Sequence, residues 1–232
     1  MSNPRGIVRQ LDNAMNSPET YELETVRCDS LYIDGVLVTS SAAEMNIMDG
    51  VTATAAELNK LDDSLATNFL TRGAGVDTAE SYATGIFRVG NLVTTRIVID
   101  LTGLVGSTTD LDIIGESAAA DCHWGQITTA KCGTIIGGYM RCLELPAGGV
   151  TDIDLYSSNV STGTENVIIT DAALGTETAL VTSGGVWTDL VTNGMTSLPT
   201  ANDYLYLVNG AAGVPGTFSA GKFEIVLFGY VA

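Results

Sequence analysis

The residues best suited to catalysis are few. His123 is the one histidine of the sequence, and it lies between Cys122 and Trp124. A nucleophilic site of the Ser-His or Cys-His kind would have to be built around it. No serine lies in a G-x-S-x-G frame, however. We therefore expect a histidine with a structural hydrogen bond, and a chain that is not an enzyme.

Metal binding is the second chemistry to consider. Cys122, His123, Cys132 and Cys142 are zinc ligands by type, but their spacing matches neither the C-x₂-C nor the H-x₃₋₅-H pattern of zinc sites. Together with Cys28 there are four cysteines, with no C-x-x-C pair and no secretory signal at the N-terminus. We expect reduced, buried thiols, no metal and no cofactor.

Carboxylates occur in two D-x-D pairs, Asp110/Asp112 and Asp152/Asp154. On a strand both members of a pair point to one face, and in a loop they could bind Ca²⁺. Neither pair is followed by the glycine and glutamate of an EF-hand, so we expect solvated strand faces. Aromatic residues make up 6% of the chain, which leaves few platforms for sugar rings. Hydrolysis of a small-molecule substrate is not expected.

Composition favours a mainly β protein. Of 232 residues, 45% are hydrophobic and 16% charged, and 26 are glycine, a balance typical of strands and turns. The formal charge of −17 argues against nucleic acid as a partner. No apolar run reaches the roughly 18–20 residues that span a bilayer, and MSNPRGIVRQ lacks the apolar core of a signal peptide. We expect synthesis in a cytoplasm and no membrane partner.

The C-terminal two-thirds of the chain, residues 84–232, is predicted to form a β-sandwich or jelly roll. Several segments alternate apolar and polar residues, and Gly-, Asn- and Ser-rich turns separate them. Seven or more strands without intervening helices are typical of these folds. The predicted strands are 92–101, 111–115, 133–145, 151–158, 165–170, 203–210 and 222–231. The change of pattern predicts a boundary within residues 74–83.

Upstream, we expect an extended arm over residues 1–29, since that stretch shows no sustained periodicity. Residues 30–73 are predicted to hold a β-hairpin and two short capped helices. The hairpin is expected at residues 30–40, where apolar residues flank Asp34-Gly35, a dipeptide typical of tight turns.

The two short helices follow from a tandem repeat, in which SAAEMNIMDGVTA is followed thirteen positions later by TAAELNKLDD. Each unit opens with an S/T-x-x-E capping box, which starts a helix. Its two apolar residues then lie three positions apart on one face, Met45/Met48 in the first unit and Leu58/Leu61 in the second. Helices this short need a partner surface to be stable in water.

The repeat at residues 42–63 resembles the TAAELNxLDGVTA-type units of phage tail fibres, head fibres and other virion appendages. The resemblance covers roughly 25 residues and is fairly specific for phage structural proteins. The second unit departs from the pattern at residues 63–65, where Asp-Ser-Leu replaces Gly-Val-Thr, which predicts the end of the array. Two units are too few for the extended stalk of a fibre, so the chain looks more like a capsid decoration (cement) protein than a long fibre. A tail-fibre or receptor-binding subunit is the alternative.

The resemblance implies a location on the outer capsid surface, the major capsid protein as partner, and a homotrimer at local threefold axes. Three copies of the repeat could bury one another's apolar edges. The basic residues near the N-terminus could pair with acidic capsid patches or solubilise a free end. Residues 21–26 could add as a strand to an exposed sheet edge of the partner. The candidate docking and trimer residues are Arg5, Ile7, Val8, Arg9, Leu11, Tyr21, Leu23, Met45, Met48, Leu58 and Leu61.

Overall fold

The computed structural model describes residues 32–33, 35–37, 69–79 and 82–232. The chain divides into two compact units, Met1–Thr54 and Ala55–Ala232.

In the first unit, strands β1 (Tyr32–Ile33) and β2 (Val36–Leu37) pair antiparallel, with Ile33 opposite Val36. Gly35, in the two-residue turn between them, has a φ of +79°, which glycine adopts at little cost. The predicted hairpin is confirmed.

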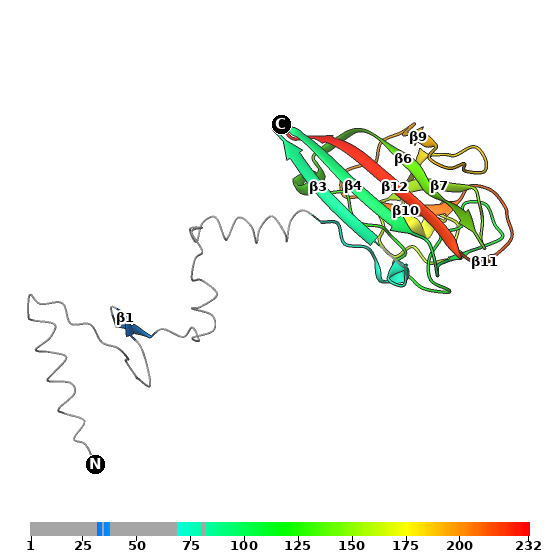
Figure 1. The fold of residues 1–232 in the computed structure, drawn as a ribbon, viewed down its shortest axis with the longest axis horizontal. Coiled ribbons are helices and arrows are strands. Elements are labelled where there is room, and N and C mark those ends of the chain that lie inside the picture. Colours follow the sequence, from blue (N-terminus) through cyan, green and yellow to red (C-terminus); the bar gives the residue numbers. More distant parts are fainter. Residues whose placement is uncertain (1–31, 34, 38–68, 80–81) are drawn as a thin grey trace, which may run out of the picture. The chain divides into compact units, whose positions relative to one another are not determined.

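The second unit is built on a five-stranded antiparallel sheet in the order β3-β4-β12-β6-β9. Its strands are β3 (Tyr82–Val89), β4 (Leu92–Asp100), β12 (Ala220–Tyr230), β6 (Thr134–Ala147) and β9 (Thr192–Gly194). Figure 1 shows β3, β4 and β12 side by side, with the last strand, β12, between β4 and β6. The two ends of the sheet are therefore the strands β3 and β9.

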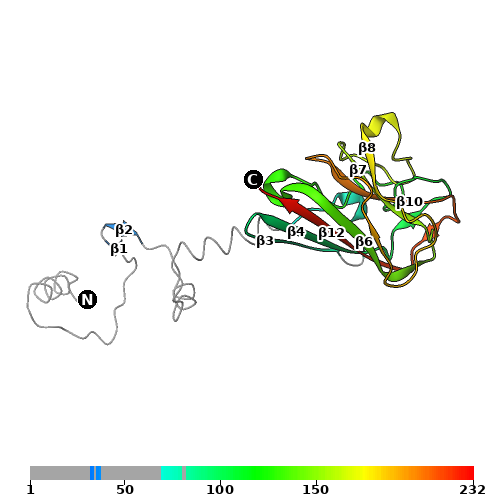
Figure 2. The ribbon, with the colours of Figure 1, turned by 90° about the horizontal axis from the view of Figure 1, so that it is seen from above.

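A second, three-stranded antiparallel sheet has the order β10-β7-β8, and Figure 2 shows it to the right of strands β3, β4 and β12. Its strands are β10 (Tyr204–Asn209), β7 (Ile153–Ser158) and β8 (Glu177–Val181). The short strands β5 (Val105–Gly106) and β11 (Gly216–Thr217) pair with each other. Residues 69–79 and 82–232 also contain three short helices: η1 (Ala74–Val76), α4 (Thr129–Cys132) and η2 (Ala172–Leu174).

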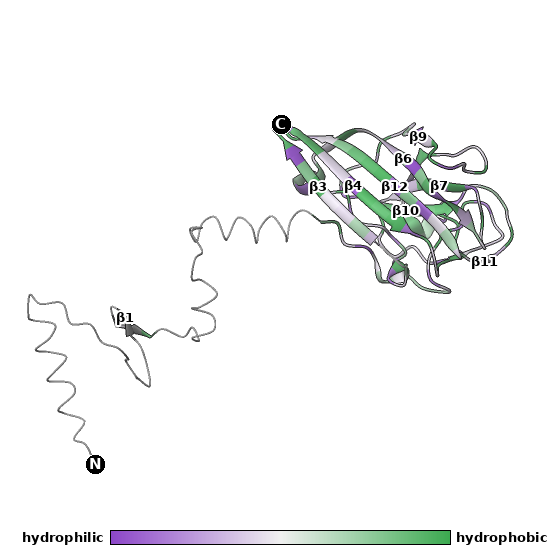
Figure 3. Cartoon of the chain, in the orientation of Figure 1, coloured by the Kyte–Doolittle hydropathy of each residue, from purple (hydrophilic) through white to green (hydrophobic). Residues whose placement is uncertain are grey.

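One hydrophobic core cluster contains residues of both sheets. Alternation places Ile97 and Ile99 of β4 in the core and Arg96 on the outside. Leu155 of β7 and Leu207 of β10 join the same cluster from the smaller sheet. In Figure 3, β12 is largely hydrophobic, with a hydrophilic stretch toward its N-terminal end.

The β domain begins earlier than residue 84, the predicted start. Leu70 and Val76 are both buried in the core. Gly73 N–H donates to the His123 carbonyl at 2.8 Å, and Gly75 N–H donates to that of Asp121 at 3.3 Å. Isolated apolar residues among polar ones and glycines gave no periodicity, so the sequence pattern did not reveal this segment.

The mainly β class is confirmed, as are the strands predicted near residues 92–101, 133–145, 151–158, 203–210 and 222–231. The sandwich or jelly-roll assignment stays a prediction. No helix in the described part of the chain is long and apolar enough to cross a bilayer.

Two predicted strands, 111–115 and 165–170, are wrong. These segments make only isolated bridges, such as Asp112 with Ile168. Leu111 and Asn166 have φ values of +65° and +63°, which interrupt an extended backbone.

Candidate functional site

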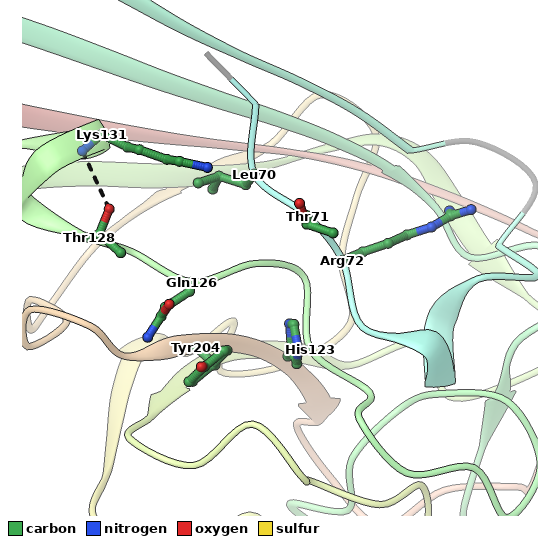
Figure 4. Close-up of a pocket in the computed structure, with 8 residues that line it drawn as sticks. All are labelled: Leu70, Thr71, Arg72, His123, Gln126, Thr128, Lys131 and Tyr204. Carbon is green, nitrogen blue, oxygen red and sulfur yellow. Dashed lines mark hydrogen bonds between the residues drawn. The ribbon is translucent and has the colours of Figure 1, made fainter. Parts of the chain in front are cut away.

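A groove of about 360 Å³ lies between the segment that leads into the β domain and the loop before α4 (Figure 4). Tyr204, at the start of β10, lies across the groove from that segment. The groove is lined by Leu70, Thr71, Arg72, His123, Gln126, Thr128, Lys131 and Tyr204. This set contains aromatic, hydroxyl, amide and cationic groups but no carboxylate.

His123 is half-buried in this groove and makes a hydrogen bond within the chain. Its Nδ1 accepts a hydrogen bond from Gly125 N–H at 3.3 Å, and its ring lies 4.8 Å from that of Tyr204, centroid to centroid. Burial lowers the pKa of His123, and the nearby Asp121 carboxylate partly opposes that shift. The adjacent Cys122 thiol bonds instead to the Gly75 and Ala119 carbonyls, at 3.4 and 3.2 Å.

The two cations of the groove already have partners. The guanidinium of Arg72 points away from the other lining side chains in Figure 4, and its Nε donates to Asp77 Oδ1 at 3.0 Å. Lys131 Nζ donates to the backbone carbonyl of Phe69 at 3.0 Å. Within the described residues, no carboxylate lies within salt-bridge distance of Lys131. A ligand in the groove would therefore meet one ammonium group that has no carboxylate partner among the described residues.

The predicted burial of the thiols is confirmed for Cys122, Cys132 and Cys142, which are all unpaired; Cys28 lies outside the described residues. Burial raises the pKa of Cys122 to about 12 and that of Cys142 to about 11, and it also raises the pKa of Cys132. Because the thiolate is the reactive form, these groups are poor nucleophiles. Among the residues that the structure describes, no group of three or more histidine, cysteine or acidic side chains could hold a metal ion.

One member of each D-x-D pair departs from the expectation of solvated strand faces, whereas Asp110 is exposed and Asp152 is half-buried. Asp112 and Asp154 are only 2% and 5% exposed. Ser107 Oγ donates to Asp112, and Ser183 N–H donates to Asp154 Oδ1 at 2.7 Å. Burial raises the pKa of Asp154, and hydrogen bonding to Ser183 partly offsets the shift. These carboxylates hold loops against the core, which the spacing alone did not indicate.

The outer face of the five-stranded sheet carries ion pairs at its middle. Glu224 of β12, almost fully buried, pairs with Arg96 of β4 and with Arg141 of β6, the latter at 3.4 Å. Further along β12, Lys222 Nζ lies 3.1 Å from Asp100 Oδ2. These contacts neutralise the buried charges of Glu224 and Asp100.

One end of the same outer face is apolar. Its side chains are 41–80% exposed, and they lie in two rows across the sheet. In one row Thr94 is opposite both Phe87 and Phe228, and in the next Leu92 is opposite both Val89 and Tyr230. We call this the apolar surface, and it consists of Phe87, Val89, Leu92, Phe228 and Tyr230.

The docking and trimer residues predicted from the sequence all lie outside the described part of the chain. These are Arg5, Ile7, Val8, Arg9, Leu11, Tyr21, Leu23, Met45, Met48, Leu58 and Leu61. Their roles stay predictions. Sequence reasoning also missed the apolar surface, because strand alternation gives no sign of which face is left uncovered.

Comparison with known proteins adds no relative: no family model, curated protein or solved structure matches the chain.

Proposed function

We propose that this chain is a structural protein of a tailed-phage virion, which binds the outer capsid surface and stabilises the head as a decoration protein. The tandem repeat at residues 42–63 carries the proposal, because its resemblance to units of phage virion appendages is close over roughly 25 residues and fairly specific for phage structural proteins. The proposed partners are the major capsid protein and further copies of the chain as a trimer.

The mechanism is adhesion. A protein bound across subunit boundaries stabilises the assembled state by the free energy of its binding. Attachment through three linked copies strengthens the binding further, because the second and third contacts form at high effective concentration.

A receptor-binding tail subunit is the second candidate, and the groove favours it. The face of Tyr204, the hydroxyls of Thr71 and Thr128 and the ammonium of Lys131 line one open space. Aromatic faces beside hydrogen-bonding groups are typical of ligand sites. A host-surface glycan with an acidic sugar is the matching ligand class.

The first test is the position of the protein on intact virions, by electron microscopy with antibody against the β domain. Density at threefold positions over the head is the expected result. Density confined to the tail would overturn the decoration role and favour the receptor-binding subunit.

A binding test follows, in which purified full-length chain is added to heads that lack it. We expect saturable binding and greater resistance of the heads to heat. Leu58→Ser should weaken binding, whereas Val186→Ser, at an exposed loop position of the β domain, should not. Absence of binding by the unmodified chain would contradict the proposal.

A further inference from the structure

The sequence contains two Asn-Gly dipeptides, Asn193-Gly194 and Asn209-Gly210. An Asn-Gly dipeptide can lose ammonia when the glycine nitrogen attacks the asparagine side-chain amide, because glycine has no Cβ to hinder the approach. The reaction needs a peptide nitrogen that is not held, a side-chain amide that can leave and a backbone that can rotate. The structure places the two dipeptides in opposite environments for all three requirements.

Asn209-Gly210 is held on every side. Asn209 is fully buried, and its side-chain nitrogen donates to three acceptors, the nearest being the Thr109 carbonyl at 2.9 Å. The Gly210 nitrogen donates to the Asp152 carbonyl, also at 2.9 Å. The backbone of Asn209 pairs with β7 on one side, and its N–H donates to the Asp112 carbonyl on the other at 3.0 Å. The leaving group, the nucleophile and the backbone are therefore all fixed.

Asn193-Gly194 ends β9, the last strand at one end of the five-stranded sheet (Figure 1). Met195 N–H donates to the Gly138 carbonyl of β6 at 3.0 Å. Successive N–H groups of an antiparallel strand point to opposite sides, so the nitrogen of Gly194 points away from β6. Gly194 is exposed and Asn193 half-buried, and the Asn193 amide bonds to none of the described side chains or carbonyls.

We propose that Asn193 is a site of spontaneous conversion to aspartate and isoaspartate. The Gly194 nitrogen attacks Cγ of Asn193 and forms a C–N bond, while the bond from Cγ to Nδ2 breaks. The proton of the Gly194 N–H leaves with the side-chain nitrogen as ammonia. Water then opens the cyclic imide at one of its two carbonyls, which gives aspartate or isoaspartate. The only co-reactant is water, and the reaction does not depend on the place of the protein in a virion.

The conversion acts on the end of the sheet. Asn193 is opposite Met140 of β6, and opposite residues of an antiparallel pair share a face. Because Met140 is fully buried, the new carboxylate lies at the rim of the core, where a charge is costly. Isoaspartate also adds a methylene group to the main chain, which moves Met195 out of register with Gly138. We expect β9 to separate from β6 in the converted chain.

The test is incubation of the folded full-length chain at mildly alkaline pH, followed by digestion and mass spectrometry of the peptides. We expect the converted fraction at Asn193 to be at least about ten times that at Asn209, because Asn209 must first lose buried hydrogen bonds. Unfolding in urea should bring the two rates together, since the dipeptide is the same.

A matched variant tests the role of the glycine nitrogen. Gly194→Ala should slow conversion at Asn193, because its methyl group hinders the attack. An added Cβ at Gly194 meets no described atom within 4 Å, so this variant should still fold. An unchanged rate at Asn193 in Gly194→Ala would overturn the proposed reaction.

Two further results would overturn the proposal. One is an equal rate at the two sites of the folded chain, and the other is an Asn193 that stays unconverted while both sites react fully in urea. Separation of β9 is read from hydrogen exchange: the Met195 amide should exchange faster in the converted chain, while the amides of β12 should not change. Equal exchange of Met195 before and after conversion would contradict the expected separation.

Discussion

Gly229 of β12 lies where that strand passes the end of α4, and a methyl group has no room there. A Cβ built on Gly229 would be 1.8 Å from the Cys132 carbonyl oxygen and 3.0 Å from its carbonyl carbon. Both contacts are to backbone, which cannot rotate away as a side chain can. The φ of Gly229 is not in the left-handed region, so Gly229→Ala tests the close approach alone.

The expected loss of stability follows from how firmly α4 is held. Thr128 caps the helix by accepting from Lys131 N–H, and Cys132 is fully buried. Relief of the clash must therefore move either α4 or the middle strand of the sheet. Overpacking of this kind costs about 1–3 kcal/mol, and contact with backbone places Gly229→Ala at about 3 kcal/mol. For a domain of this size that is a fall in Tm of about 6–12 °C.

Thermal unfolding followed by circular dichroism measures this effect, with Gly194→Ala as the matched control. Gly194 lies in β9 of the same sheet, and its added Cβ would meet nothing within 4 Å. We expect the control to change stability by less than about 1 kcal/mol, because alanine there mainly restricts the unfolded chain. Equal Tm values for Gly229→Ala and the wild type would refute the steric argument.

Three further predictions concern buried polar groups. Because burial raises the pKa of Asp154 in the folded state, its contribution to stability is greatest below the unfolded pKa of 3.8 and is lost as pH rises through the folded pKa. Asp154→Asn should flatten this part of the pH profile in denaturant titrations. Tyr206→Phe removes a hydroxyl that bonds to Val160 O at 2.7 Å and should cost about 1–3 kcal/mol in the same assay. In the Cys28→Ser variant, Ellman's reagent at pH 8 should label no thiol until the protein is unfolded.

The strands that could be predicted from the sequence are those whose apolar residues alternate without interruption. In β4 this pattern reflects burial of one face in the core, whereas β10 is buried on both faces from Leu205 to Asn209. Strand β3 was missed because Gly85 and its polar neighbours weaken the alternation. The segments 111–115 and 165–170 were predicted as strands but are not strands. Their sequences look extended, but Leu111 and Asn166 adopt left-handed backbone that interrupts them.

The features of the candidate site could be predicted only where residue type was decisive. Three buried thiols and the structural hydrogen bond of His123 follow from their chemistry. The burial of Asp154 depends on Ser183, 29 positions away, and no local pattern encodes that contact. The groove likewise depends on Tyr204 meeting a segment more than 130 residues earlier in the chain.

The central place of β12 has a consequence for biosynthesis. This strand pairs with β4 over nine positions and with β6 on its other side, yet it is the last strand of the sheet to be synthesised. Until it emerges from the ribosome, the facing edges of β4 and β6 have no partner and the core cannot close. The domain must therefore fold after its last strand is made, and a chain cut short before residue 220 would be left to chaperones and proteases.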